Sequence, residues 1–455
     1  MAIRLFRQTD SDMTEGSIWR HLLEFAVPMA IGLLFQQLYN TVDAIVVGRY
    51  VSKEALAAVG STGSIINTLV GFCAGLATGA SVLVSQCYGA HENEKLHDAV
   101  HTTVAVSLIM CVLATLLGIL FVDPMLAFMK TPSDVYKDAK DYLTVYFAGV
   151  TGLLMYNMGS GILRAVGDSR RPLYFLCISA LLNIGFDLLF VLGFGMGVKG
   201  VAYATVLSQL ISAVLVLLLL TLKKAPYSIQ WKKLCIKTGT LRRILAVGLP
   251  SGLQQAVTSF SNVFVQSYIN AFGSACMAGW TCCNKVEIYV ALPVQALSLA
   301  STTFVGQNYG AGKLERARKG ARNALTMSVC LTAVLVGVAM LLREPLITLF
   351  NDDPEVVYYG CLFVMYLTPF YILVCFNNIF AGALQGIGRA RGSMIAMLSS
   401  FVVFRQIYLY INSLLGGSFA VTALGYPAGW AVCLIIMTVL YKRSSLCCGE
   451  KRNIE

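Results

Sequence analysis

An aspartate stands inside an apolar stretch of this chain that is long enough to cross a lipid bilayer as a helix. The residue is Asp43, and the stretch covers residues 18–47. A carboxylate inside a membrane helix costs about 2.5–3.5 kcal/mol on insertion scales, so it is usually paired or functional. We therefore predict that Asp43 belongs to a polar site inside the membrane. The alternative is a carboxylate at the helix end that water hydrates.

Three further side chains with oxygen atoms are predicted at a similar depth. Asn183 and Asp187 are four residues apart and share one face of a helix. Thr205 follows in the next apolar stretch. Hard cations such as Na⁺ take carboxylate, amide and hydroxyl oxygens, and neighbouring carboxylates share a proton. We predict that these three side chains and Asp43 bind a cation, Na⁺ or H⁺. The alternative is four separate residues in interfacial water.

Charged residues also occur in apolar stretches of the second half, at Lys285, Glu287 and Arg405. They form either a structural ion pair between helices or part of a substrate or gating site. Amide and aromatic side chains in other stretches suit a cleft for lipophilic cations. The candidates for this cleft or a secondary site are Gln36, Tyr39, Asn40, Tyr156, Asn157, Gln209, Asn262, Lys285, Glu287 and Arg405.

The composition indicates a membrane protein. Of 455 residues, 57% are hydrophobic and 13% are charged, whereas soluble domains have about 25% charged residues. Apolar runs bounded by glycine, proline or charges predict an all-α fold with twelve membrane-spanning helices. The predicted spans are 18–47, 54–85, 97–122, 138–163, 172–193, 199–222, 243–270, 275–305, 320–342, 356–385, 393–413 and 421–441.

The lysines and arginines indicate the orientation of these spans. With the N-terminus in the cytoplasm, inner segments hold 25 of the 34 basic residues and outer segments hold 7. This asymmetry follows the positive-inside rule, so we predict that both termini are cytoplasmic and that the first helix directs insertion. It also explains the net charge of +11 without a nucleic-acid partner.

The two halves of the sequence repeat each other. Gln86-Cys87-Tyr88-Gly89-Ala90 returns 221 residues later as Gln307-Asn308-Tyr309-Gly310-Ala311. Six spans per half keep both halves in the same orientation, which predicts two bundles related by a pseudo-twofold axis along the membrane normal. We expect an N-terminal lobe at 1–222, a flexible cytoplasmic linker at 223–243 and a C-terminal lobe at 244–455. A cleft between the lobes would open alternately to each side.

Motifs of the common enzyme classes are missing. The sequence has no P-loop, no His-Glu-x-x-His motif and no Gly-x-Ser-x-Gly motif. The 14 cysteines have no metal-ligand spacing and are expected to fill space in the helix bundles. We therefore expect no enzyme activity and no cofactor beyond the coupling ion.

Several of these segments together resemble the multidrug and toxic compound extrusion (MATE) family, in its DinF-like branch. They are Leu38-Tyr39-Asn40-Thr41-Val42-Asp43, Val46-Val47-Gly48-Arg49, Ala55-Leu56-Ala57-Ala58-Val59-Gly60, Gly161-x-Leu163-Arg164-Ala165-x-Gly167-Asp168 and Gln307-Asn308-Tyr309-Gly310-Ala311. The resemblance covers nearly the whole chain. It implies two six-helix lobes and the export of organic cations driven by the entry of Na⁺ or H⁺.

The resemblance also implies roles for single residues. In this branch an acid in the first helix, an Asn-x-x-x-Asp pair in the fifth and a threonine in the sixth form the cation site. The matching residues here are Asp43, the Asn183–Asp187 pair and Thr205. An acid in the seventh helix of other branches is missing, and Glu287 matches an acidic position in the eighth.

We therefore expect a monomeric multidrug or metabolite antiporter in the bacterial cytoplasmic membrane, of the kind that confers antibiotic resistance. Pro28 is a candidate bend in its first helix. One alternative is a flippase for lipid-linked precursors or polysaccharides from the same wider superfamily, which Lys285 and Arg405 would favour. A membrane-embedded transferase is a second alternative, although the four histidines form no catalytic cluster.

Overall fold

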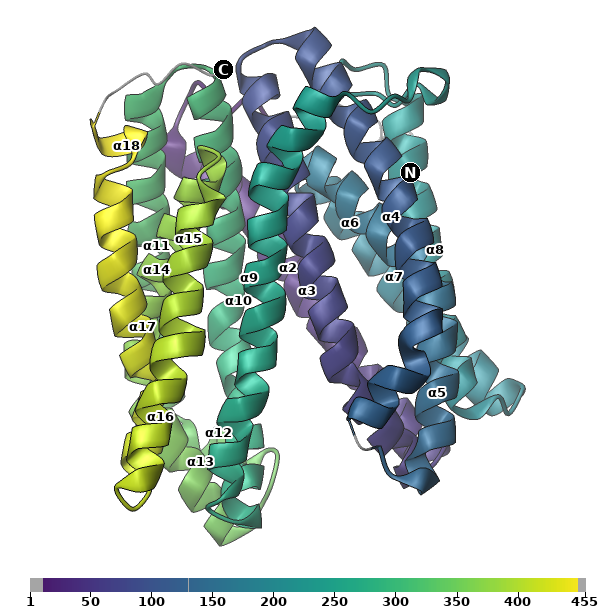
Figure 1. Ribbon diagram of the computed structural model, residues 1–455, viewed down its shortest axis with the longest axis vertical. Coiled ribbons are helices and arrows are strands. Elements are labelled where there is room, and N and C mark those ends of the chain that lie inside the picture. The colour runs from purple at the N-terminus through teal and green to yellow at the C-terminus, as the bar shows by residue number, and fades with distance from the viewer. Residues whose placement is uncertain (1–10, 130, 449–455) are drawn as a thin grey trace. The chain divides into compact units, whose positions relative to one another are not determined.

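The computed structural model describes residues 11–129 and 131–448, and these ranges are helical without any β-strand (Figure 1). Two π-helical turns, Leu189–Gly193 and Leu398–Phe404, continue the helices that precede them. The α-helices are α2 (Ile18–Tyr50), α3 (Lys53–Gly89), α4 (Asn93–Phe128), α5 (Ser133–Ala148), α6 (Val150–Ala165), α7 (Arg170–Leu188), α8 (Gly197–Leu222), α9 (Thr238–Asn270), α10 (Ser274–Gly310), α11 (Leu314–Leu341), α12 (Arg343–Thr348), α13 (Pro354–Leu367), α14 (Tyr371–Gly386), α15 (Ala390–Met397), α16 (Arg405–Leu414), α17 (Phe419–Lys442) and α18 (Ser445–Cys448).

These helices confirm the predicted all-α membrane fold. Ten helical segments of the described chain are long and apolar enough to cross a membrane. The other two predicted spans, 138–163 and 243–270, correspond to α5 with α6 and to α9. The helices run past most predicted ends; α3, for example, continues to Gly89. The reason is that backbone hydrogen bonds continue along a helix beyond its apolar part.

The chain divides into two units. Unit 1 comprises residues 11–12 and Ile31–Gly252, and unit 2 comprises Met13–Ala30 and residues 253–448. Helices α2 and α9 thus contribute to both units, and each division falls two residues after a proline, Pro28 or Pro250. A proline inside a helix removes one backbone hydrogen bond and weakens the helix locally. Even so, α2 is a single helix across Pro28.

In unit 1, α6 packs against α3, α4 and α8, and α7 packs against α8 (Figure 1). Glycine permits the closest of these approaches. A Cβ atom added at Gly152 on α6 would lie 2.7 Å from the backbone nitrogen of Leu210 on α8. The two helices therefore meet backbone to backbone, which fixes the position of α8 in the unit.

In unit 2, α10 packs against α11, α13 and α14, and α14 packs against α17. Aromatic rings fill the space between these helices. Trp280 on α10 contacts Phe363 on α13 and Tyr426 on α17, with ring centroids 4.9 and 5.2 Å away. Large rings bury much apolar area and hold the helices in register.

The connection between α8 and α9, residues 223–237, is packed on unit 1. Its side chains Tyr227 and Ile229 are buried in the apolar core of the unit. The backbone N–H of Gln230 donates to Nε2 of His101 on α4 at 2.9 Å, and His101 is fully buried. The segment expected to be a flexible linker is therefore docked, because its apolar residues reach the core.

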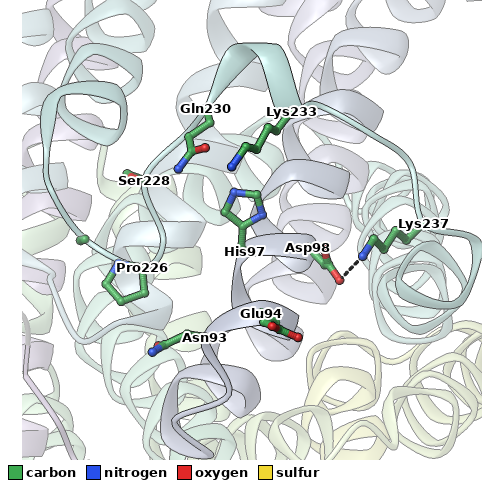
Figure 2. Close-up of a pocket in the computed structure, with 10 residues that line it drawn as sticks. Asn93, Glu94, His97, Asp98, Pro226, Ser228, Gln230, Lys233 and Lys237 are labelled. Carbon is green, nitrogen blue, oxygen red and sulfur yellow. Dashed lines mark hydrogen bonds and ion pairs between the residues drawn. The ribbon is translucent and has the colours of Figure 1, made fainter.

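The docked connection and the start of α4 border a pocket of about 550 Å³ (Figure 2). His97 and Asp98 face it from α4, and Gln230 and Lys233 face it from the connection. Lys237 Nζ donates to Asp98 Oδ2 at 2.6 Å, and this hydrogen bond raises the pKa of the lysine. None of the predicted site residues lines this pocket.

Candidate functional site

Two acidic side chains meet in unit 1. Asp43 lies on α2, Asp187 lies at the end of α7, and their carboxyl groups are direct neighbours. Asp187 is fully buried and Asp43 is half-buried. Apart from each other, Asp43 Oδ1 and both oxygens of Asp187 have no hydrogen-bond partner within the described part of the chain.

This pair of carboxyl groups requires a proton or a cation to balance its negative charge. Two adjacent carboxylates removed from water repel each other, so one of them takes up a proton or a cation binds between them. A proton would also supply the missing hydrogen bond. A small hard cation would find oxygen ligands already in place. The geometry therefore suits reversible binding of H⁺ or of Na⁺.

Asn183 lies on the same helix as Asp187, and Thr205 lies on the neighbouring helix α8. Asn183 is buried one helical turn before Asp187 on α7, and neither its amide oxygen nor its amide nitrogen has a partner among the described residues. Thr205 is buried on α8, which packs against α7, and its hydroxyl donates to the Val201 carbonyl at 3.0 Å. Asn183 can therefore offer a free oxygen, and Thr205 keeps lone pairs for a further ligand.

An apolar cluster fixes the helices that carry the acids. Val46 and Val47 on α2 are buried against Val191 in the π-helical turn after α7 and against Val201 on α8. Val47 follows Asp43 by one helical turn. The cluster therefore anchors α2 next to Asp187.

Sequence reasoning missed Tyr142, which lies on α5. Its side chain is only 7% exposed, and its hydroxyl is close enough to Asp43 and Asp187 to interact with both electrostatically. Its ring stacks on Tyr146 with centroids 6.3 Å apart, and Tyr39 lies near Tyr146 and Asp43. The spacing of Tyr142 and Tyr146, four residues on one helix face, was the available signal.

The other predicted residues of unit 1 take different positions. Gln36 lies beside Tyr39, Gln209 lies beside Tyr146, and Asn40 is exposed. Tyr156 donates to the Pro172 carbonyl at 3.0 Å, and Asn157 donates to the Leu153 carbonyl at 2.9 Å. Tyr156 and Asn157 are therefore bonded to nearby backbone.

The three predicted charges of unit 2 do not pair with one another. Lys285 Nζ lies 5.0 Å from the centroid of the Phe350 ring. Glu287 is buried beside Tyr371 and Cys283. Arg405 donates to Asn262 Oδ1 at 2.8 Å. Of the two alternatives for these residues, the structural ion pair between helices is therefore wrong for the part of the chain that the structure describes.

A family model matches this chain twice, once in each half of the sequence repeat. The MatE model matches residues 28–189 and again residues 250–411, a spacing of 222 residues. The two matches together cover most of the chain. Each starts at one of the prolines, Pro28 or Pro250, that precede the unit divisions.

Curated relatives are similar over nearly their full length. The probable multidrug resistance protein YoeA of Bacillus subtilis (strain 168) is 28% identical, with 94% of each chain covered. The probable multidrug resistance protein NorM of Thermotoga maritima is 26% identical, with 88% of each chain covered.

A solved structure has the same fold. It is a transporter of the MOP superfamily from Pyrococcus furiosus Vc1 (DSM3638), described with a binding pocket of reverse polarity. It is 25% identical and covers 96% of this chain and 99% of its own, with a TM-score of 0.91. With the family model matched in both halves, the protein is a member of the MATE family, a multi-pass membrane transporter of small molecules and not an enzyme.

Proposed function

We propose that this protein exports lipophilic organic cations in exchange for Na⁺ or H⁺, with Asp43 and Asp187 as the coupling acids. One observation carries the proposal: apart from the other carboxyl group, three of the four oxygens of these two neighbouring carboxyl groups have no hydrogen-bond partner in the described chain. Such a pair binds one proton or one small cation far better than it tolerates two bare charges. Asn183 and Thr205 complete the proposed cation site.

The coupling follows from the charge of the pair. When a proton or Na⁺ is bound, the repulsion between Asp43 and Asp187 is relieved and α2 can stay close to α7. When the ion leaves, the two charges repel and favour a different arrangement of α2. An ion that binds one arrangement better shifts the population toward it. Exchange results if the organic substrate prefers the arrangement without the ion.

The surroundings of the acids support an organic cation as substrate. Tyr39, Tyr142 and Tyr146 line the same region, and aromatic faces attract cations. The relatives named multidrug resistance proteins support a broad range of substrates for this chain. We further propose that the protein is a monomer in the bacterial cytoplasmic membrane with both termini in the cytoplasm, as the basic residues indicate.

The test is efflux of ethidium from lipid vesicles that contain the purified full-length protein. Na⁺ and pH gradients are imposed separately, so that the gradient that drives efflux identifies the coupling ion. We expect Asp43→Asn to abolish gradient-driven efflux although the variant still inserts. Normal export by this variant would disprove the proposal.

Asp123→Asn is the matched control. Asp123 is an exposed aspartate of unit 1 that accepts hydrogen bonds from Tyr136 and Lys140 at 2.8 and 2.9 Å. Its replacement removes the same charge from the same unit without touching the acid pair. We expect efflux by this variant to equal that of the unmodified protein.

A further inference from the structure

Unit 2 buries an arginine that has no counter-charge. Arg405 opens α16, directly after the π-helical turn Leu398–Phe404, and only 3% of it is exposed. Within the described residues, no aspartate or glutamate reaches ion-pair distance of its guanidinium group. A charged side chain inside a membrane protein is usually paired, and an unpaired one marks a functional position.

The neighbours of Arg405 satisfy only part of its guanidinium group. Nη2 donates to Asn262 Oδ1 at 2.8 Å and to Ser261 Oγ at 3.2 Å, both on α9. The Tyr426 ring covers one face, with its centroid 4.8 Å from the guanidinium carbon. The Nε–H group is buried without a partner in the described chain. These contacts orient the group but leave its charge and one donor unmatched.

The one acid close to this region points elsewhere. Glu287 is also near Tyr426, but its neighbours are Tyr371 and Cys283. It therefore does not neutralise Arg405. Asn262 is exposed and uses its amide oxygen toward Arg405, so its amide NH₂ group remains available as an additional donor.

A second buried arginine shows how this chain treats a structural one. Arg171 in unit 1 is buried and donates through Nη1 to Asp168 Oδ2 at 2.9 Å. The backbone N–H of Arg171 donates to the other oxygen of the same carboxylate. Arg171 thus has its counter-charge within three residues. Arg405 has none in the described chain, although its burial is similar.

We propose that Arg405, together with Asn262, is a binding site for an anionic oxygen group, a carboxylate or a phosphate. The guanidinium plane offers parallel N–H donors that match such a group, and Tyr426 holds the plane in place. The site rests on the proposed function for one point, namely that its ligand is a transported compound. Substrates would then include molecules that carry an anionic group beside a lipophilic cation.

Two dyes that differ at one group test the site. Rhodamine 123 is a lipophilic cation, and rhodamine 110 is the same dye with the methyl ester replaced by a free carboxylate. Binding to the full-length protein is measured by fluorescence anisotropy in phosphatidylcholine nanodiscs. We expect Arg405→Gln to weaken binding of rhodamine 110 by about tenfold and to leave rhodamine 123 unchanged, because only the carboxylate loses a charge-assisted hydrogen bond.

Two further variants make the result specific. Lys319→Gln removes an exposed positive charge from α11 of unit 2 and is expected to change neither affinity. Arg405→Lys keeps the charge without the planar fork and is expected to restore part of the rhodamine 110 affinity. Thermal unfolding of the ligand-free protein gives a readout without any dye. The melting temperature of Arg405→Gln should equal or exceed that of the unmodified protein, because a buried charge without a counter-charge does not stabilise the fold.

A second lipid separates the two sources of the anion. If the site holds a lipid headgroup, phosphatidylglycerol nanodiscs will lower rhodamine 110 binding, and Arg405→Gln will remove that competition. Equal dye affinities in all variants and in both lipids would overturn the site, as would a melting temperature several degrees lower for Arg405→Gln. The outcome is independent of coupling: if Asp43→Asn exports ethidium normally, the proposed exchange fails while the binding result for Arg405 stands.

Discussion

Units 1 and 2 share a repeat but carry their buried charges at positions that do not correspond. At the 221-residue shift, Asn183 corresponds to Phe404 and Asp187 corresponds to Tyr408. Asp43 falls at Val265 or its neighbour, and Val265 is fully buried in the apolar core of unit 2. The buried acid pair of unit 1 therefore has no counterpart in unit 2, where Arg405 is buried and its Nε–H group lacks an acceptor in the described chain.

This difference shows that the scaffold and the sites are specified separately. Backbone contacts such as those at Gly152 and the aromatic packing around Trp280 build each bundle and need no charge. The buried ionisable groups add no obvious stability, since burial without a partner is unfavourable. Their presence in different places in the two halves supports different tasks: ion coupling in unit 1 and recognition of an anionic group in unit 2.

The largest expected effect concerns the two buried arginines. Asp168→Asn leaves Arg171 without its counter-charge, and we expect it to lower the free energy of unfolding by about 3–5 kcal/mol. Arg405→Gln should change it by less than about 1 kcal/mol, because no ion pair is lost. Thermal unfolding of both variants measures the difference. Equal destabilisation would show that Arg405 is structural and would remove the contrast between the units.

The next effect separates the two halves of the repeat in transport. We expect Asp187→Asn to lower gradient-driven ethidium efflux by about 100-fold, equivalent to ~2.7 kcal/mol, because a neutral amide cannot exchange the coupling ion. Tyr408→Phe, at the corresponding position of unit 2, should leave efflux within about twofold of the unmodified protein. Similar losses in both variants would contradict the assignment of coupling to unit 1.

A smaller effect is expected at Tyr142. Its counterpart in unit 2 is Phe363, so Tyr142→Phe makes the two halves alike at this position. Loss of the hydroxyl near the two carboxyl groups should reduce efflux by about tenfold, equivalent to ~1.4 kcal/mol for one hydrogen-bonding group. Initial efflux rates at a fixed gradient measure the change. Tyr136→Phe, which removes an exposed hydroxyl of the same helix, serves as the control.

The smallest effect concerns the docked connection of unit 1. His101→Ala leaves the Gln230 N–H without its acceptor, which we expect to lower the local stability of residues 227–237 by about 1 kcal/mol. Hydrogen exchange of this segment should become faster, while α4 remains protected. Lys95→Ala is the control, because the side chain of this exposed α4 residue pairs with Glu92 beside the start of the helix. Unchanged exchange in His101→Ala would show that Tyr227 and Ile229 alone hold the connection.

The sequence alone determined the helices, the repeat and the family. Runs of apolar residues predict membrane helices because the bilayer requires every backbone group to be satisfied within the helix. The repeat of Gln86–Ala90 at Gln307–Ala311 is visible in the amino-acid sequence alone. The two MatE matches are separated by nearly the same number of residues. Local rules therefore sufficed for the architecture of this protein.

Only the tertiary structure decided which polar groups meet. Depth along the membrane predicted that Asp43 and Asp187 lie at one level, but their direct approach depends on how α2 packs beside α7. The same kind of reasoning grouped Lys285, Glu287 and Arg405, which have other neighbours and form no ion pair with one another in the described chain. Residues at equal depth on different helices can face different neighbours, because the rotation of each helix about its axis is fixed by packing across the bundle. The polar composition of residues 223–237 predicted a flexible linker. The structure docks this segment instead, because Tyr227 and Ile229 are buried in the core of unit 1.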